Sequence, residues 1–247
     1  MKVLLPVLLL LCSALPLFAE EAPIHLPGIK GEDDRTIVES LEWPWSAVVK
    51  VNRRTGGYCT GVLVAPDKVL TAAHCLWLSR TDHWLTPDAL HVVVNYRRGD
   101  WTDDAPVVSY IMGPDPDLPR EGENAKLPLD WAVLTVAKPL GEPIPLAAPG
   151  RETAGPDEAM MQAGFSQDAR HVPTMNRACH VVAMVRGGKL FLHDCDAVNG
   201  DSGSPLMIAS PDGSVRLVGI HSATVNQNGT MLGLAVSAQT LRAALGQ

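Results

Sequence analysis

The sequence has no surplus of positive charge, and outside its amino terminus it has no long apolar run. Its 20 Lys and Arg residues stand against 27 Asp and Glu residues, which gives a formal net charge of −7. Nucleic-acid-binding proteins need a clustered basic surface, so this balance argues against DNA or RNA as a partner. Heptads, internal repeats and low-complexity tracts are also missing, which argues against coiled coils and repeat folds.

The amino terminus has the composition of a secretory signal. Met1 and Lys2 give a positive start, residues 3–11 are almost entirely apolar, and Ala19 is a small residue at a plausible cleavage point. The apolar stretch is too short, and too polar on its far side, for a membrane span. We therefore expect residues 1–19 to be a signal peptide, and the protein to be secreted or periplasmic without a stable membrane anchor.

Cysteine is scarce, and its count fits export. Of the five cysteines, one lies in the expected signal, which leaves Cys59, Cys75, Cys179 and Cys195. An even number of cysteines in an exported chain suggests two disulfides. The alternative is four free, buried thiols.

Strand-forming runs are short, and the turns between them are rich in Pro, Gly and Asp, a pattern that favours β-barrels or sandwiches. A Pro-rich segment at 139–156 forms a credible linker between two sets of strands. Apolar residues on one helical face predict a terminal helix at 237–245. The expected strands are 46–51, 59–65, 69–72, 90–96, 107–112 and 131–137 in the first set, and 159–165, 180–185, 189–193, 205–209, 215–221 and 231–236 in the second.

The stretch from Cys195 to Pro205 has the features that a serine nucleophile on a tight turn requires. Ser202 follows Gly-Asp, precedes Gly-Ser-Pro, and stands before an apolar run. Gly200 lets the backbone approach a substrate closely. If the N–H groups of Gly200 and Ser202 point into one hollow, they can bind the oxyanion that forms when a carbonyl is attacked.

A serine hydroxyl is a weak nucleophile and needs a base, and His74 is the best candidate. Asp130 precedes a clean apolar strand and could orient the imidazole. The three motifs read Thr-Ala-Ala-His-Cys (71–75), Asp-Trp-Ala-Val-Leu (130–134) and Gly-Asp-Ser-Gly-Ser-Pro (200–205). Together they resemble the motifs of the chymotrypsin/trypsin family of serine endopeptidases, closest to secreted bacterial enzymes of the trypsin-like and glutamyl-endopeptidase types.

The resemblance implies an all-β fold of two six-stranded antiparallel β-barrels, with the active site in the cleft between them and a short C-terminal helix. Residues 37–145 would form the first barrel, which carries His74 and Asp130. Residues 146–247 would form the second barrel, which carries Ser202, and the helix. The resemblance also implies a Cys59–Cys75 disulfide beside the histidine. A Cys179–Cys195 bridge would then follow, in a place that departs from the family's usual pattern.

Residues 20–36 are polar and acidic, so we expect a propeptide or an N-terminal arm. Within them, residues 29–36 resemble the amino-terminal segment of glutamyl endopeptidases, whereas cleavage after Arg35 would resemble trypsinogen activation. In the trypsin family the acid next to the nucleophile, here Asp201, pairs with the amino terminus freed by such a cut. The usual Ile-Val-Gly-Gly terminus is missing, so both readings stay open.

The expected substrate pocket contains Asp196, His221 and Ser222, and its signals conflict. Asp196 stands where trypsin carries the carboxylate that receives Arg or Lys, whereas His221 stands where glutamyl endopeptidases carry a histidine for acidic side chains. A buried carboxylate must find a substrate cation or an internal partner, and His221 is a candidate partner. The sequence gives a slight preference for cleavage after Arg or Lys.

We expect no catalytic metal and no cofactor. The acidic segment 113–128 has no fixed calcium-ligand spacing, and consecutive residues of a strand, such as His193 to Asp196, alternate faces and cannot surround one metal. Protein or peptide substrates, and a protein inhibitor, are the expected partners of a monomer. The two alternative functions are a serine esterase, whose Gly-x-Ser-x-Gly elbow would need glycine in place of Ser204, and an inactive binding protein with a protease fold.

Overall fold

The computed structural model describes residues 26, 28–113, 130–155 and 158–246. The expected signal peptide and most of the acidic segment 113–128 lie outside these residues. Among the described helices, none is long and apolar enough to cross a membrane.

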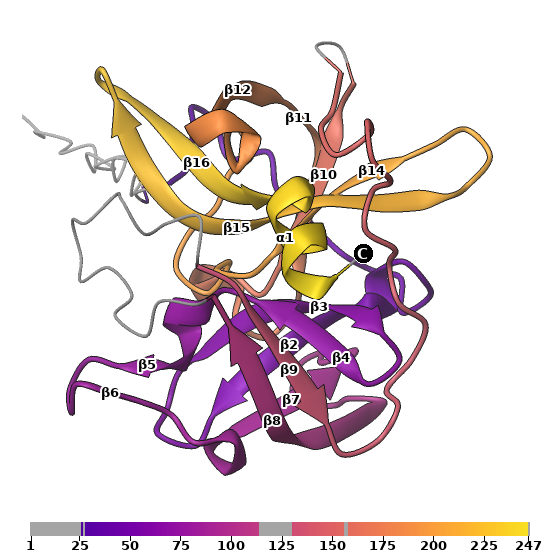
Figure 1. The fold of residues 1–247 in the computed structure, drawn as a ribbon, viewed down its shortest axis with the longest axis vertical. Coiled ribbons are helices and arrows are strands. Elements are labelled where there is room, and N and C mark those ends of the chain that lie inside the picture. The colour runs from indigo at the N-terminus through magenta and orange to yellow at the C-terminus, as the bar shows by residue number, and fades with distance from the viewer. Residues whose placement is uncertain (1–25, 27, 114–129, 156–157, 247) are drawn as a thin grey trace, which may run out of the picture.

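The first unit is a closed antiparallel β-barrel of six strands, drawn in purple to magenta in Figure 1. Its strands are rich in valine and leucine, which suit a pleated and buried surface, and residues such as Val49, Leu70 and Leu134 are fully buried. In barrel order the strands are β2 (Val48–Arg53), β3 (Tyr58–Ala65), β4 (Lys68–Thr71), β9 (Ala132–Val136), β8 (Asp103–Met112) and β7 (Leu90–Val94).

The second unit is an antiparallel sheet that packs against the first (Figure 1). Strand β11 ends at Cys179 and strand β12 begins at Val181, so only His180 separates them in the sequence. In the sheet, β11 is the second strand from one edge and β12 forms the other edge. In sheet order the strands are β1 (Thr36–Ile37), β11 (Thr174–Cys179), β10 (Met160–Gly164), β14 (Pro205–Ala209), β15 (Val215–Gln227), β16 (Thr230–Ser237), β13 (Leu190–His193) and β12 (Val181–Val185).

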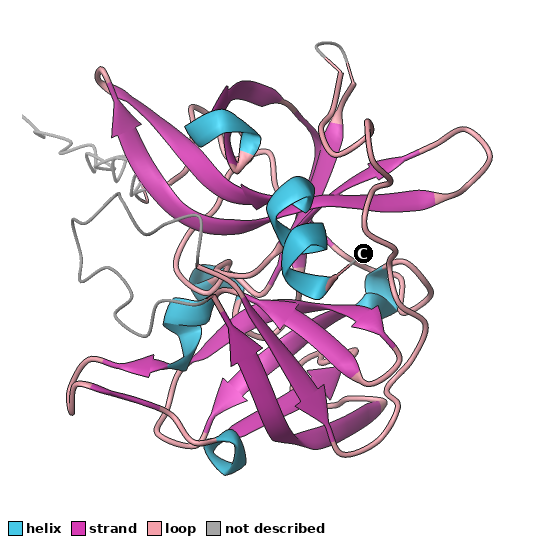
Figure 2. Cartoon of the chain, viewed as in Figure 1, coloured by secondary structure: helices cyan, strands magenta, loops and turns pink. Residues whose placement is uncertain are grey.

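The helices are short and lie outside the two sheets (Figure 2). Helix α1 (Ala238–Leu245) begins at the Ser237 cap, whose side chain accepts a hydrogen bond from Thr240 N, and ends at Gly246 in the left-handed conformation. The other helices in the described residues are 3-10 turns: η1 (Trp45–Ala47), η2 (Ala73–Leu76), η3 (Pro87–Ala89), η5 (Gln167–Ala169) and η6 (Arg186–Gly188). A small hairpin of β5 (Trp77–Leu78) and β6 (His83–Trp84) follows η2.

The N-terminal arm is bound to the second unit. β1 pairs with β11, and Val38 N donates to Pro173 O. The side chain of Arg35 is almost fully covered and forms ion pairs with Asp33 and Asp168. The uncut chain therefore holds this segment as an added edge strand.

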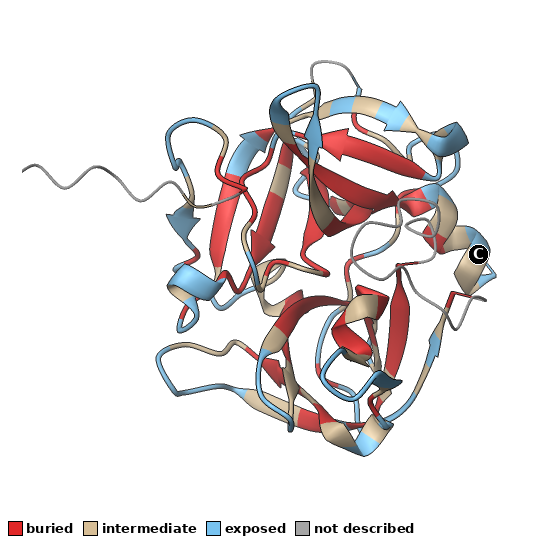
Figure 3. Cartoon of the chain, turned by 90° about the vertical axis from the view of Figure 1, so that its left-hand side faces the viewer, coloured by how far each residue is buried: buried red, intermediate tan, exposed pale blue. Residues whose placement is uncertain are grey.

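The predicted all-β architecture with two barrel units and a short terminal helix is confirmed, and buried residues line both units (Figure 3). One detail differs, because backbone hydrogen bonds in the second unit join eight strands instead of six. The arm supplies β1, and β11 has a mixed polar sequence that does not show the pattern of a strand.

Candidate active site

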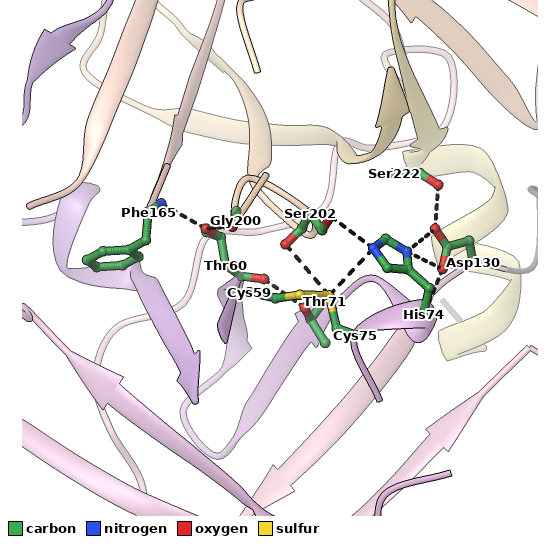
Figure 4. Close-up of a disulfide and its surroundings, with 10 residues drawn as sticks. All are labelled: Cys59, Thr60, Thr71, His74, Cys75, Asp130, Phe165, Gly200, Ser202 and Ser222. Carbon is green, nitrogen blue, oxygen red and sulfur yellow. Dashed lines mark hydrogen bonds and ion pairs between the residues drawn. A yellow bond between two sulfur atoms is a disulfide. The ribbon is translucent and has the colours of Figure 1, made fainter. Parts of the chain in front are cut away.

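His74, Asp130 and Ser202 lie in one hydrogen-bonded row at the junction of the two units (Figure 4). His74 Nε2 lies 2.9 Å from Ser202 Oγ, and His74 Nδ1 lies 2.9 Å from Asp130 Oδ2. The backbone N–H of His74 also donates to Asp130 Oδ1 at 2.9 Å. The structure thus brings His74 together with two residues that lie 56 and 128 positions after it in the sequence.

Asp130 is buried, whereas the His74 side chain is 42% exposed. Burial alone would raise the pKa of Asp130, but the charge and hydrogen bonds of His74 and the hydrogen bond from Ser222 lower it. Burial alone would lower the pKa of His74, but Asp130 raises it above its ordinary value. The pair therefore favours an ionised carboxylate beside an imidazole that readily takes a proton.

Ser222 extends this row on the side of Asp130. Its Oγ donates to Asp130 Oδ2, a contact that the sequence did not predict, and its place in the substrate pocket stays a prediction. Asp130 Oδ2 therefore has two hydrogen-bond partners, Ser222 Oγ and His74 Nδ1. The second donor helps to fix the orientation of the Asp130 carboxylate.

Both predicted disulfides are formed in the structure. Cys75 follows His74 in η2, and its Sγ lies 3.9 Å from His74 Nε2. The Cys59–Cys75 bridge therefore ties the histidine's turn to strand β3. Two clusters of potential metal ligands each contain one of these disulfides: Cys59–His74–Cys75 and Cys179–Asp194–Cys195. The cysteines cannot serve as thiolate ligands there, because their sulfurs are bonded to each other.

The turn that carries the nucleophile is anchored to the first unit by Thr60. Thr60 N donates to Ser202 O at 2.9 Å, and Thr60 Oγ1 donates to Gly200 O at 2.9 Å (Figure 4). Gly200 has a φ of 98°, and a Cβ there would lie 2.3 Å from Phe165 O, so only glycine fits. The first barrel thus contributes to the position of the N–H groups expected to bind an oxyanion.

Asp201 is buried behind this turn. It accepts hydrogen bonds from Ser166 Oγ at 2.8 and 3.0 Å and from Val198 N at 2.9 Å. Thr174 Oγ1 lies 2.9 Å from Ser166 Oγ. Burial raises the pKa of Asp201 to about 6. Within the described residues, hydroxyl and amide groups bind this carboxylate, and no ammonium or guanidinium group does.

Asp196 has an internal partner, but it is not His221. Its Oδ1 accepts a hydrogen bond of 2.6 Å from Lys30 N, in the N-terminal arm. The Lys30 ammonium donates to Gly28 O at 3.0 Å and to Cys195 O. Burial raises the pKa of Asp196. The arm therefore satisfies the carboxylate for which the sequence suggested a substrate cation or a histidine.

His221 instead pairs with a second histidine. Its Nδ1 lies 3.1 Å from His193 Nε2, and both side chains are buried. Burial lowers the pKa of His221 to about 3 and that of His193 well below its ordinary value. Both rings are therefore neutral at neutral pH. Sequence reasoning did not connect His193 with this site, because the two histidines are 28 residues apart and on different strands.

Comparison with known proteins places the chain in a family. The family model described as Trypsin matches residues 35–244. The chain belongs to the trypsin family. Human chymotrypsin-like elastase family member 3B is 28% identical over 220 residues, which are 78% of this chain and 77% of the relative. This family consists of serine endopeptidases, so the enzyme class predicted from the sequence is confirmed.

Two further similarities concern glutamyl endopeptidases. Bacillus licheniformis glutamyl endopeptidase is 34% identical over 58 residues, which are 23% of this chain but only 18% of the relative. A solved structure titled as Glu endopeptidase in complex with MPD superposes with a TM-score of 0.68 at 20% identity, and covers 89% of this chain and 100% of that one. At this identity the structural likeness supports the fold alone.

Proposed function

We propose that this trypsin-family chain is a secreted serine endopeptidase that cuts peptide bonds through Ser202, His74 and Asp130. The observation that carries the proposal is the 2.9 Å contact between His74 Nε2 and Ser202 Oγ, in line with the buried Asp130. This is the distance over which a histidine removes a proton from a hydroxyl nucleophile.

In this mechanism His74 takes the proton from Ser202 Oγ as the oxygen attacks the peptide carbonyl. The protonated imidazole then gives the proton to the departing amine, and water releases the acyl-enzyme by the same steps in reverse. Asp130 holds the imidazole in the tautomer whose Nε2 accepts a proton, and stabilises its charged form. Because Asp130 raises the pKa of His74, activity should fall as the pH drops through that raised pKa.

The N–H groups of Gly200 and Ser202 would bind the oxyanion. Each such donor contributes on the order of 3 kcal/mol to the transition state. The carbonyls of Gly200 and Ser202, which accept hydrogen bonds from Thr60, lie on the peptide units that follow these two N–H groups. The peptide unit that carries the Gly200 N–H is itself held by a hydrogen bond from Gln167 N to Asn199 O. These bonds support the assignment, because they hold the turn before substrate arrives.

For the residue before the cut bond, we retain Arg or Lys as the hypothesis to test. Asp196, six positions before Ser202, supports it. One observation speaks against it: the Asp196 carboxylate already accepts a hydrogen bond from the backbone N–H of Lys30, which a substrate cation would have to share. The rival is Glu, supported by His221 and by the short match to a glutamyl endopeptidase.

Cleavage-site profiling with a peptide library tests this choice, using the wild type, Asp196→Ser and His221→Val. We expect cuts after Arg and Lys that Asp196→Ser abolishes. Cuts after Glu that survive Asp196→Ser and vanish with His221→Val would overturn the hypothesis.

The two alternative functions are weaker. Ser204 stands where an esterase elbow needs glycine, and the chain order His, Asp, Ser differs from the order in such hydrolases. An inactive binding protein would not need the row of hydrogen bonds from Ser222 to Ser202. An active-site-directed fluorophosphonate probe separates the cases, because it should label Ser202 in folded protein. Failure to label would favour the binding protein.

The two disulfides and the family's secreted relatives support an extracellular or periplasmic location. Protein or peptide substrates are the partners that the family implies. A monomeric state and control by a protein inhibitor remain parts of the proposal.

A further inference from the structure

Arg53 ends strand β2, on the hairpin that carries one half of the active-site disulfide. Val51 pairs with Cys59 across β2 and β3, and Arg53 N donates to Gly57 O at 3.1 Å. Because side chains two residues apart lie on the same face of a strand, Arg53 shares its face with Val51 and Cys59. Its side chain therefore lies on the side of the hairpin where the disulfide forms.

The guanidinium of Arg53 lies over the hairpin turn. A Cβ at Gly57 would be only 2.3 Å from Arg53 Nη2, so glycine makes room for it. Arg53 Nε is buried without an acceptor, and in the described part of the chain Arg53 takes no part in an ion pair. Burial lowers the pKa of Arg53, although a guanidinium remains charged at neutral pH. Arg53 is thus a partly desolvated cation without a carboxylate.

This cation is close enough to act on the site. The charge of Arg53 lowers the pKa of His74, against the larger opposite effect of Asp130. The disulfide lies between the Arg53 hairpin and His74, because Cys59 of the hairpin is bonded to Cys75, whose Sγ lies 3.9 Å from His74 Nε2. In the proposed reaction the departing amine must meet His74 Nε2. Because Cys75 Sγ lies beside Nε2, substrate residues after the cut bond would pass the disulfide on the side of the hairpin that Arg53 shares.

We propose that Arg53 is a specificity-determining residue that binds an acidic side chain on the leaving-group side of the substrate. The inference rests on the proposed endopeptidase function. A planar guanidinium matches a carboxylate with two parallel hydrogen bonds. Because Nε is buried, the two Nη groups of Arg53 are the donors that would make them.

The test uses matched peptides that carry Glu, Gln or Lys at the first, second or third position after the cut bond. The ratio of kcat/KM values within one enzyme preparation does not depend on how much of a variant folds. At low salt we expect the wild type to prefer Glu by about tenfold at one of these positions, as for a hydrogen-bonded charge pair that solvent partly screens.

Arg53→Gln should bring this ratio to about one, and Arg53→Glu should reverse it in favour of Lys at the same position. Arg54→Gln is the matched control, because Arg54 is exposed and pairs with Asp88, and it should keep the preference for Glu. Equal cleavage of Glu and Gln peptides by the wild type at all three positions, or a preference that survives Arg53→Gln, would overturn the inference. If no peptide is cut at all, it is the proposed function that has failed.

Discussion

Ser166 Oγ donates to the Asp201 carboxylate, 2.8 Å from Oδ2, in a fully buried position behind the nucleophile's turn. This bond favours the ionised form of Asp201, whose pKa burial raises from 3.8 to about 6. A carboxyl with a raised pKa stabilises the folded state through its bound proton. That contribution is complete below pH 3.8 and is lost as the pH rises through about 6.

Replacing Ser166 with Ala should therefore destabilise the protein more at pH 8 than at pH 5. At pH 8 the ionised Asp201 loses a donor, which costs about 2 kcal/mol. At pH 5 the carboxyl is largely protonated and loses less. Urea unfolding in a Ser202→Ala background, which prevents autolysis, measures both values. Ser214→Ala is the control, since Ser214 donates to the exposed Asp212 and should show little difference between the two pH values. A loss that is equal at both pH values would contradict the account.

The same contacts predict that cleavage after Arg35 is not required for activity. In the uncut chain, Asp201 is already bound by Ser166 and Val198, and β1 is paired with β11. Arg35→Gln should block a trypsin-like cut while leaving the density of active sites, measured by active-site titration, near that of the wild type. An enzyme that stays inactive, while the wild type gains activity as a new terminus at Thr36 forms, would show trypsinogen-like control instead.

The two disulfides offer a matched pair of experiments, because each joins cysteines 16 positions apart. Loss of either should cost about 3 kcal/mol of stability through the entropy of the unfolded chain. Only the Cys59–Cys75 bridge touches His74, so Cys59→Ala with Cys75→Ala should also lower kcat by about tenfold, through misplacement of the base. Unfolding and steady-state assays on both double variants check this. An equal fall in kcat for the two variants would contradict the special role of the first bridge.

Much of the fold could be predicted from local sequence. The expected strand at 205–209 matches β14 (Pro205–Ala209), and the expected helix matches α1 to one residue at its start. β15 (Val215–Gln227) runs six residues past its predicted end, because pairing with β16 continues into a polar hairpin. β1 was missed because its strand character comes only from its partner β11.

The triad could be predicted because each member lies in a short motif of its own. The contacts that hold the nucleophile's turn and the expected substrate pocket could not be predicted. Lys30 reaches Asp196 across 166 positions, and Thr60 reaches Gly200 across 140. Such contacts follow from the packing of the arm and the two units, and isolated serines, threonines and lysines carry no local signal of it. The sequence predicted Ser222 only as a residue of the pocket, and gave no sign that its hydroxyl donates to Asp130.

The most direct test of the central claim is the burst of leaving group released when a chromogenic ester acylates the enzyme. The wild type should release about one equivalent before the slower steady state, because Ser202 forms an acyl-enzyme. Ser202→Ala keeps the fold's contacts through the residue's backbone and should show no burst. A burst in Ser202→Ala that matches the wild type would contradict the assignment of Ser202 as the nucleophile.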